Sequence, residues 1–413
     1  MKYLKLIGMV LMLTISANVI TSCSDEEGEQ DDTILINPDG TTSVGHVFEV
    51  LDVTSFYLDH IKYTFVGDCL VVTGYDKTGF SGSAVIPSRI SFSGKTYVVT
   101  EIGESAFMDC NSLTNISLPE TLNQIGDHAF ARCTSLTSIA IPTHVSKIGK
   151  YAFHVCESLS RAEFVSIEHL CSIEFETNTS NPLFYAHHLY IKGREVRDVI
   201  IPNGITEIAQ FTFWGCSALT SVSIPESVTE IGQEAFHNCS GLTSIRLPSH
   251  LTKIGKYAFA QCTGLTSLAI PESVTIISSF AFSGCENLVS VSIPDGEIAI
   301  GSFVFEYCRS LTSITLPQGI TVIYPLTFAN CTSLRSITIP SSVTQIRDAA
   351  FYGCVNIKEI VSLIEQPFAI GQAFTDIYDS ATLYVPVGSM DEYKATEGWN
   401  QFQNIVEGMK AIR

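Results

Sequence analysis

The sequence predicts a β-rich solenoid whose coils are each 23 residues long, because three residue types recur at that interval. Every interval between successive repeat phenylalanines is 23 residues, except one of 60 between Phe153 and Phe213. A Cys follows most of these phenylalanines by three positions, and a Pro marks the same phase of the repeat. The repeat phenylalanines are Phe107, Phe130, Phe153, Phe213, Phe236, Phe259, Phe282, Phe305, Phe328, Phe351 and Phe374.

Each repeat contains one longer and one shorter strand pattern. In the segment 219–224, LTSVSI, the last apolar residues alternate with polar ones, which is the period-two pattern of a strand with one buried face. Pro225 is expected to end that strand because it has no N–H to donate. Val228 and Ile231 then form a second, shorter alternation.

The rest of the repeat predicts a tight turn. Gly232 begins the turn, and Phe236 and Cys239 fit one or two short helical turns that point the ring inward. One such coil cannot bury its own apolar face. Stacked in register about 4.8 Å apart, consecutive coils would bury one continuous core, so each residue column would contact copies of itself.

The repeated Cys is predicted to be a structural thiol. Ten of the 13 cysteines occupy one inward column, where a small and weakly polar side chain fits. Metal sites need thiols two to four residues apart, which this column does not supply. In-register side chains point the same way, so disulfides between neighbouring coils are also disfavoured. Cys69 and Cys171 lie outside the column and stay unassigned.

The repeat resembles a known family. The segment L-x-x-[IV]-x-[IL] is similar to the leucine-rich-repeat strand, and the full unit resembles the BspA-like, or Treponema-type, leucine-rich repeat. The resemblance covers residues of about 84–386, while 382–407 and 188–202 look like the family's C-terminal segment and irregular insertion. It implies a right-handed, curved solenoid on the cell surface, in a family linked to adhesion to host matrix proteins and to other cells.

The repeat pattern and its breaks suggest seven regions. A strand–loop–strand pattern fills the long interval, with alternations at Ile173/Phe175 and Leu189/Ile191 that predict a protruding hairpin. The regions are a lipoprotein signal peptide 1–22, an acidic tether 23–45, a β-hairpin N-terminal cap 46–100, repeats 101–159, an irregular hairpin insertion 160–199, repeats 200–360, and a C-terminal repeat and cap 361–413.

The N-terminus predicts a lipid anchor. A short basic start and an apolar stretch too short to span a membrane run into Ile20-Thr21-Ser22-Cys23. This ending resembles the lipobox of bacterial lipoproteins, in which Cys23 would carry the lipid; an ordinary secretory signal with a chance Cys is the alternative. Six of the next nine residues are acidic, which predicts a solvated tether. That tract also resembles the export signal of Bacteroidetes-type surface lipoproteins, so we expect an outer-membrane lipoprotein exposed at the cell surface.

Charge and motifs exclude several functions. The formal net charge is -19, which disfavours nucleic acid and anionic lipid headgroups as partners. The His residues are scattered, and no nucleophile elbow, zinc-protease motif or phosphate-binding Gly loop occurs. His169, Cys171, Glu174, His187 and His188 lack the spacing of a metal site and read as exposed loop residues. We therefore expect no catalytic residue, no cofactor and no metal.

The outward side of the longer strand is a candidate binding surface if the sheet is concave; variable loop positions, the hairpin near 176–190 and the caps are the alternatives. The outward side carries near-uniform Ser and Thr with a single Arg, so it is either a solvated scaffold or a low-affinity contact surface. The leading hypothesis is a non-catalytic, surface-anchored solenoid that binds extracellular or host proteins. The alternative is a glycan-binding or structural lipoprotein of an envelope or nutrient-uptake complex. The candidate ligand-binding residues are Ser223, Arg246, Ser292, Thr315 and Thr338.

Overall fold

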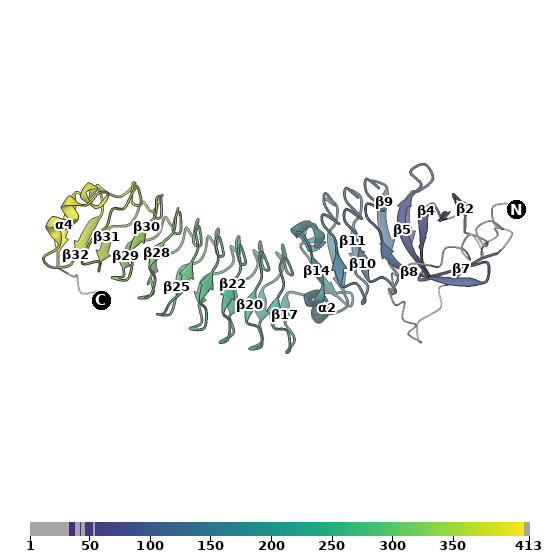
Figure 1. Cartoon of the computed structure of the whole chain (residues 1–413), viewed down its shortest axis with the longest axis horizontal. Coiled ribbons are helices and arrows are strands. Elements are labelled where there is room, and N and C mark those ends of the chain that lie inside the picture. Colours follow the sequence, from purple (N-terminus) through teal and green to yellow (C-terminus); the bar gives the residue numbers. More distant parts are fainter. Residues whose placement is uncertain (1–32, 38–41, 43–45, 53, 409–413) are drawn as a thin grey trace. The chain divides into compact units, whose positions relative to one another are not determined.

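The computed structural model describes residues 33–37, 42, 46–52 and 54–408 (Figure 1). The predicted signal peptide 1–22 and Cys23 lie outside the described residues. The chain divides between Glu195 and Val196 into two compact units. No helix in the described ranges is both long and apolar enough to cross a bilayer.

The second unit is a stack of coils with two ladders of parallel strands (Figure 1). The longer strands are β17 (Asp198–Ile200), β19 (Ser221–Ser223), β21 (Ser244–Arg246), β23 (Ser267–Ala269), β25 (Ser290–Ser292), β27 (Ser313–Ile314), β29 (Ser336–Ile339), β31 (Glu359–Ser362), β32 (Thr382–Val385) and β33 (Asn404–Glu407). The shorter strands are β18 (Glu207–Ile208), β20 (Glu230–Ile231), β22 (Lys253–Ile254), β24 (Ile276–Ile277), β26 (Ala299–Ile300), β28 (Val322–Ile323) and β30 (Gln345–Ile346).

The register confirms the predicted solenoid. Ser221 of β19 pairs with Ser244 of β21, which is the equivalent residue one coil later. The inward phenylalanines therefore stack on their own copies: Phe236 and Phe259 have ring centroids 5.2 Å apart and an interplanar angle of 2°. Both rings are fully buried. The core is thus a continuous aromatic column with aliphatic columns beside it.

The third side of each coil is a run of tight turns rather than a strand. Phe236 N–H donates to the Ala258 carbonyl of the next coil at 2.8 Å, while Cys239 N–H donates to the Phe236 carbonyl at 3.2 Å. Glu234 and Asn238 have positive φ values of 54° and 59°, and their N–H groups also donate to the next coil. These turns satisfy the backbone polar groups without a regular ladder.

The predicted glycine at the start of the turn is required by close approach of the coils. A Cβ on Gly232 would lie 2.7 Å from the backbone nitrogen of Gln210, and one on Gly255 would lie 2.6 Å from the carbonyl carbon of Gly232. Both contacts are to backbone, which cannot move aside. A side chain there would therefore push neighbouring coils apart.

The Cys column is buried and free, as predicted. Each thiol from the second coil of a unit onward also has a role that the sequence reasoning missed. The Cys262 thiol donates to the Phe236 carbonyl of the preceding coil at 3.1 Å, and the Cys285 thiol donates to the Phe259 carbonyl at 3.2 Å. The thiols thus fill space and also supply a weak hydrogen bond between coils. Cys171, outside the column, is likewise a free and buried thiol.

The first unit begins with a β cap. Strands β2 to β5 form an antiparallel meander, and β7 and β8 form a hairpin. Strand β8 is shared with the solenoid because it pairs in parallel with β10 (Gln124–Ile125), the shorter strand of the next coil. The cap strands are β1 (Ile34–Ile36), β2 (Phe48–Val50), β3 (Ser55–Leu58), β4 (Ile61–Val66), β5 (Cys69–Tyr75), β6 (Gly82–Val85), β7 (Arg89–Phe92) and β8 (Lys95–Ile102).

The coils of the first unit follow the same pattern up to the long interval. Phe107, Phe130 and Phe153 stack at 5.4 Å spacing. The remaining elements are β9 (Leu113–Ser117), β10 (Gln124–Ile125), β11 (Ser138–Ala140), β12 (Lys147–Ile148), β13 (Arg161–Phe164), α2 (Ile167–Ser172), β14 (Glu174–Phe175), η1 (Asn178–Ser180), α3 (Leu183–Ala186), β15 (Leu189–Ile191) and β16 (Arg194–Glu195).

The predicted hairpin between Ile173–Phe175 and Leu189–Ile191 is wrong. Strand β14 pairs in parallel with β12, and β15 pairs in parallel with β13. The alternating patterns did mark strands, but each strand adds to the exposed edge of the preceding coil instead of to the other. The long interval therefore holds an enlarged coil, in which Ser166 caps α2 after β13 and α3 follows η1.

The C-terminal end is closed by aromatic side chains. Trp399 is fully buried, with its ring centroid 5.9 Å from that of Phe374, the last residue of the Phe column. Its indole N–H donates to the Phe368 carbonyl at 3.0 Å. Helix α4 (Met390–Ala395) places Tyr393 beside it, and η2 (Trp399–Gln401) follows. This cap covers a core face that would otherwise contact water.

The thiols of the Cys column should resist alkylation while the chain is folded. Burial raises the pKa of Cys156 and of Cys285 to about 12, so these thiols stay protonated at about pH 9, above the usual Cys pKa. Iodoacetamide followed by peptide mass spectrometry should show them unmodified in buffer and modified in urea. Rapid labelling of the native chain would contradict the closed core.

Candidate binding surface

The candidate residues lie in one outward column of the second unit. Strand pairing places Ser223 beside Arg246, and an isolated bridge places Thr315 beside Thr338. Four of the five candidates are exposed and Thr338 is half-buried. The structure thus arranges them along one sheet face, and Ser292 pairs with Ala269 between the two ends of this series.

Arg246 is the one cationic side chain in this column, and it is largely uncommitted. Its side chain is 89% exposed, and its nearest acid is Glu226, with 3.7 Å between Nη2 and Oε1. Hydrogen bonds from Ser249, and secondarily the charge of Arg246, hold the pKa of Glu226 below its usual range. The carboxylate is therefore positioned mainly by Ser249, which leaves Arg246 able to meet a ligand.

Two kinds of hydroxyl occur on the strands. Thr hydroxyls just before the shorter strands donate to the preceding coil, as Thr252 does to the Thr229 carbonyl at 3.0 Å. Among the outward Ser hydroxyls of the longer strands, Ser221 donates to Asp198 at 2.6 Å. Within the residues that the structure describes, Ser267 and Ser290 make no side-chain hydrogen bond, so their hydroxyls are open to solvent or to a ligand.

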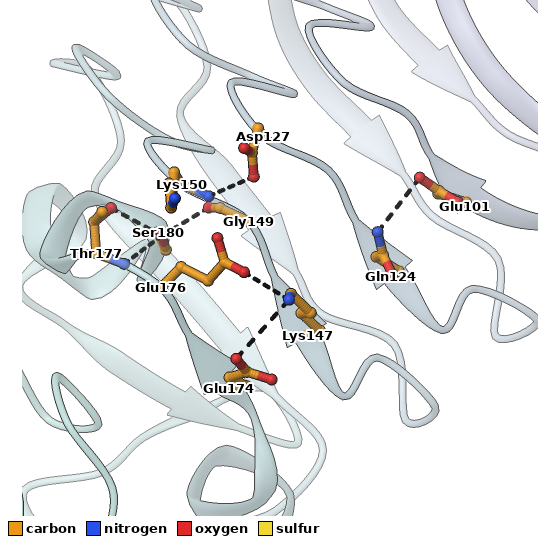
Figure 2. A network of polar contacts seen from close by, with 10 residues as sticks. All are labelled: Glu101, Gln124, Asp127, Lys147, Gly149, Lys150, Glu174, Glu176, Thr177 and Ser180. Atoms are coloured by element: carbon orange, nitrogen blue, oxygen red, sulfur yellow. Dashed lines mark hydrogen bonds and ion pairs between the residues drawn. The ribbon is translucent and has the colours of Figure 1, made fainter.

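A charged column on the shorter strands of the first unit was missed by the sequence reasoning (Figure 2). Lys147 Nζ lies 2.6 Å from Glu176 and 3.9 Å from Glu174, and Gln124 donates to Glu101 at 3.5 Å. The hydrogen bond to Glu176, then the charge of Glu174, raises the pKa of Lys147. These groups satisfy one another between coils, and such surface pairs contribute about 0–1 kcal/mol each. We assign this network to coil packing.

A half-buried aromatic column in the second unit was also missed. Tyr257, Phe280 and Phe303 stack with ring centroids 4.5 and 4.3 Å apart. All three have positive φ, a conformation that favours Gly or Asn. The signal was visible as an aromatic residue two positions before five of the repeat phenylalanines, three of them in consecutive repeats. Ring stacking between coils offsets the backbone cost.

The described residues contain no group of three or more side chains suited to hold a metal ion. His188, one of the residues considered for metal binding, instead lies 2.5 Å from Glu195 between Nδ1 and Oε1. His169 is buried, and its Nε2 lies 3.1 Å from the Val145 carbonyl. The His188 ring is therefore engaged within the enlarged coil and the His169 ring by the preceding coil, so His169 is not the exposed loop residue that the sequence predicted.

Comparison with known proteins identifies the repeat. A family model described as a BspA type leucine rich repeat region matches residues 88–184, 186–296 and 252–377. The chain belongs to the BspA-type leucine-rich-repeat family. No curated protein matches the sequence significantly. Membership supports an interaction or adhesion scaffold, and leucine-rich-repeat solenoids are typically non-catalytic.

Two solved structures are similar to this BspA-type chain. A leucine rich cell surface protein from Faecalibacterium prausnitzii is 25% identical with a TM-score of 0.51, over 86% of this chain and 95% of that chain. A leucine-rich repeat protein from Bacteroides ovatus is 23% identical with a TM-score of 0.52, over 86% of this chain and 100% of that chain. The second likeness supports the fold.

Replacing Phe280 by Asn should destabilise the BspA-type solenoid although Asn suits the backbone better. The substitution relieves a left-handed conformation that costs about 1–2 kcal/mol. It also removes two ring contacts worth about 0.5–1.5 kcal/mol each, together with the apolar burial. We expect a net loss of about 1–2 kcal/mol, measured from urea unfolding.

Ala349 provides the matched control. It occupies the same column with φ of 57° and carries no ring. Ala349→Asn should leave stability unchanged or raise it by up to about 1 kcal/mol. If Phe280→Asn were also neutral, the stacked rings would contribute nothing and a purely functional reason for them would be needed.

Proposed function

We propose that this chain is a non-catalytic binding scaffold, anchored at the bacterial surface by a lipid on Cys23, that engages proteins of the host or of neighbouring cells. Family membership and the similar cell surface protein support the interaction role. The sequence resemblance to a lipobox supports the anchor. The outer membrane is the location that the acidic tract after Cys23 favours.

The outward column of the second unit is the observation that carries this proposal. It presents a row of open hydroxyls with one exposed guanidinium, on a sheet whose backbone is held rigid by its ladders. Arg is enriched among residues that dominate protein interfaces. Arg246 would make the main charged contact, while Ser223, Ser292, Thr315 and Thr338 would hydrogen-bond along an extended partner.

The acidic charge favours a particular kind of partner. At a net charge of -19, the chain attracts neutral or basic protein surfaces and repels nucleic acid and acidic polymers. Arg246 lies within this acidic surface, so a partner segment with one carboxylate flanked by polar or basic residues fits best. Repetition of the hydroxyls along the coils would add many weak contacts to this one.

The lipid anchor predicts that Cys23→Ala releases the chain from the membrane. Without the thiol no lipid can be attached, so the proposed anchor is lost. Fractionation of cells expressing each form should move the variant from the membrane pellet to the soluble fraction. Protease treatment of intact cells checks the orientation, because a surface-exposed chain is degraded. Retention of the variant in the membrane would refute the anchor.

If the outward column binds the partner, charge changes in that column should weaken binding more than the same changes on the shorter strands. The double variant Ser292→Arg/Arg246→Glu alters the outward column, and Ala299→Arg/Lys253→Glu makes the same charge changes on the shorter-strand ladder. Surface plasmon resonance against a panel of host matrix proteins should show saturable binding by the unmodified chain. The first variant should weaken that binding about tenfold or more and the second by less than about twofold, since 1.4 kcal/mol corresponds to tenfold.

The same panel should include soluble glycans, which separate the two functions. Saturable glycan binding without protein binding would favour the alternative of a glycan-binding or structural envelope lipoprotein. Equal losses in both double variants would show that charge alone drives association. A loss confined to the Ala299→Arg/Lys253→Glu variant would move the binding face to the shorter strands.

A further inference from the structure

The first unit has a cavity of about 240 Å³ beside the point where the 23-residue period breaks. Its apolar lining includes Ala140, Pro142 and Val165, and its charged lining consists of Glu120, Glu163 and Lys192. These residues come from three successive coils, with Ala140 at the end of β11 and Glu163 in β13. The cavity lies on the outward side of the longer strands, where the second unit has its hydroxyl column.

The sequence explains why a cavity forms here. Ala140 pairs in register with Glu163, so a small side chain stands next to a long one in the same outward column. The turn between β15 and β16, with Lys192 at φ 49° and Gly193 at φ 76°, then brings Lys192 into the lining. This antiparallel turn belongs to the enlarged coil. The small Ala140 side chain, the carboxylates of Glu120 and Glu163, and Lys192 thus line one cavity.

Glu163 is held in a fixed position. Its Oε2 accepts from Arg161 Nη2 at 2.7 Å, and its Oε1 accepts from Gly193 N–H at 2.6 Å. The Arg161 guanidinium lies 4.0 Å from the centre of the Tyr190 ring, which fixes it in turn. Arg161 beside it holds the pKa of Glu163 below its usual range. Each oxygen keeps a lone pair for a further donor.

Glu120 and Lys192 complete the polar lining. Glu120 Oε2 accepts from Thr143 N–H at 2.8 Å, which leaves Oε1 for a ligand. Lys192 is exposed, and within the described ranges its ammonium has no ion-pair partner. The cavity therefore offers carboxylate acceptors, an ammonium donor and apolar side chains.

We propose that this cavity binds one ring of a neutral glycan. The volume lies below the roughly 300–1,000 Å³ of pockets for drug-sized ligands, which suits a single sugar ring. The apolar C–H face of such a ring can pack on Ala140, Pro142 and Val165. Its hydroxyls can donate to the two carboxylates and accept from Lys192. Rigid, pre-positioned acceptors favour such a ligand because little ordering is needed on binding.

The mixed charges of the lining favour a neutral occupant over a charged one. A Lys or Arg side chain of a partner would bring a second cation next to Lys192. An acidic sugar or a carboxylate would face Glu120 and Glu163 within a chain of net charge -19. A neutral, hydroxyl-rich ring meets neither repulsion. This site is separate from the protein-binding column of the second unit and does not depend on it.

The test uses the whole folded chain and a panel of neutral methyl glycosides of hexoses, deoxyhexoses and N-acetylhexosamines. Saturation-transfer difference NMR should detect saturable, weak binding of at least one of them. Ala140→Leu fills the cavity and should abolish the signal, while Lys192→Ala should weaken binding about tenfold by removing a charged hydrogen-bond donor. Ala269→Leu is the matched control, since Ala269 is also exposed and ends the equivalent strand β23.

The outcomes separate the alternatives. Binding that is lost in Ala140→Leu and kept in Ala269→Leu supports the site. Absence of binding by every methyl glycoside, or equal binding by Ala140→Leu and the unmodified chain, overturns it. Nα-acetyl-lysine methylamide, which keeps its side-chain ammonium, is included as a cationic probe. Suppose that this probe binds, that Ala140→Leu removes its binding, and that no glycoside binds. The cavity is then a pocket for a basic side chain of a protein instead.

Discussion

The structure depends on one constraint, namely that each coil hydrogen-bonds to its neighbours in a fixed register on all three sides. Ser221 pairs with Ser244 on the longer strands, and Phe236 N–H donates to the Ala258 carbonyl on the turn side. Because this register is fixed, every side chain must fit against its own copy in the adjacent coils. A residue type that packs well once is therefore selected at each turn, which is the physical origin of the 23-residue period. It also explains why both ends need caps, since the outermost coil lacks a partner.

The Cys column shows how narrow this selection is. The Phe carbonyl beneath each ring already accepts the backbone N–H of its own turn, and eight thiols donate to such a carbonyl from the following coil at 3.0 to 3.4 Å. Alanine at these positions would leave a void and lose the bond, and both defects are costly in a dry core. Serine would bury a more polar group, which costs more when its geometry is imperfect. A thiol is small, weakly polar and tolerant of a long hydrogen bond. No catalytic or metal-binding role is therefore needed to explain the repeated Cys.

The same constraint decides what could be predicted from the sequence. Columns that recur, such as Phe, Cys and the outward Ser, follow from the period alone, and the structure places them as expected. The interval around residues 160–199 was misjudged because no repeat fixes which neighbour a strand pairs with; β14 and β15 each joined the preceding coil. Glu297 shows a shift of one residue. It stands at the position of the buried Val274 in the preceding repeat, yet it is exposed, and the next residue, Ile298, is buried instead. The cavity needed coordinates, because Glu120 and Lys192 are 72 positions apart in the sequence.

Regular and irregular coils therefore offer different kinds of surface. A regular coil must repeat its outward residues at the same height and spacing, so it can present rows of similar groups but few distinctive arrangements. Where the period breaks, residues of different type become neighbours, as Ala140 and Glu163 do, and a turn can bring a residue such as Lys192 into the same lining. Such a place costs little stability here because the enlarged coil still extends both ladders. In a solenoid of this kind, the rows supply many weak contacts, and the breaks supply the shape that distinguishes one ligand from another.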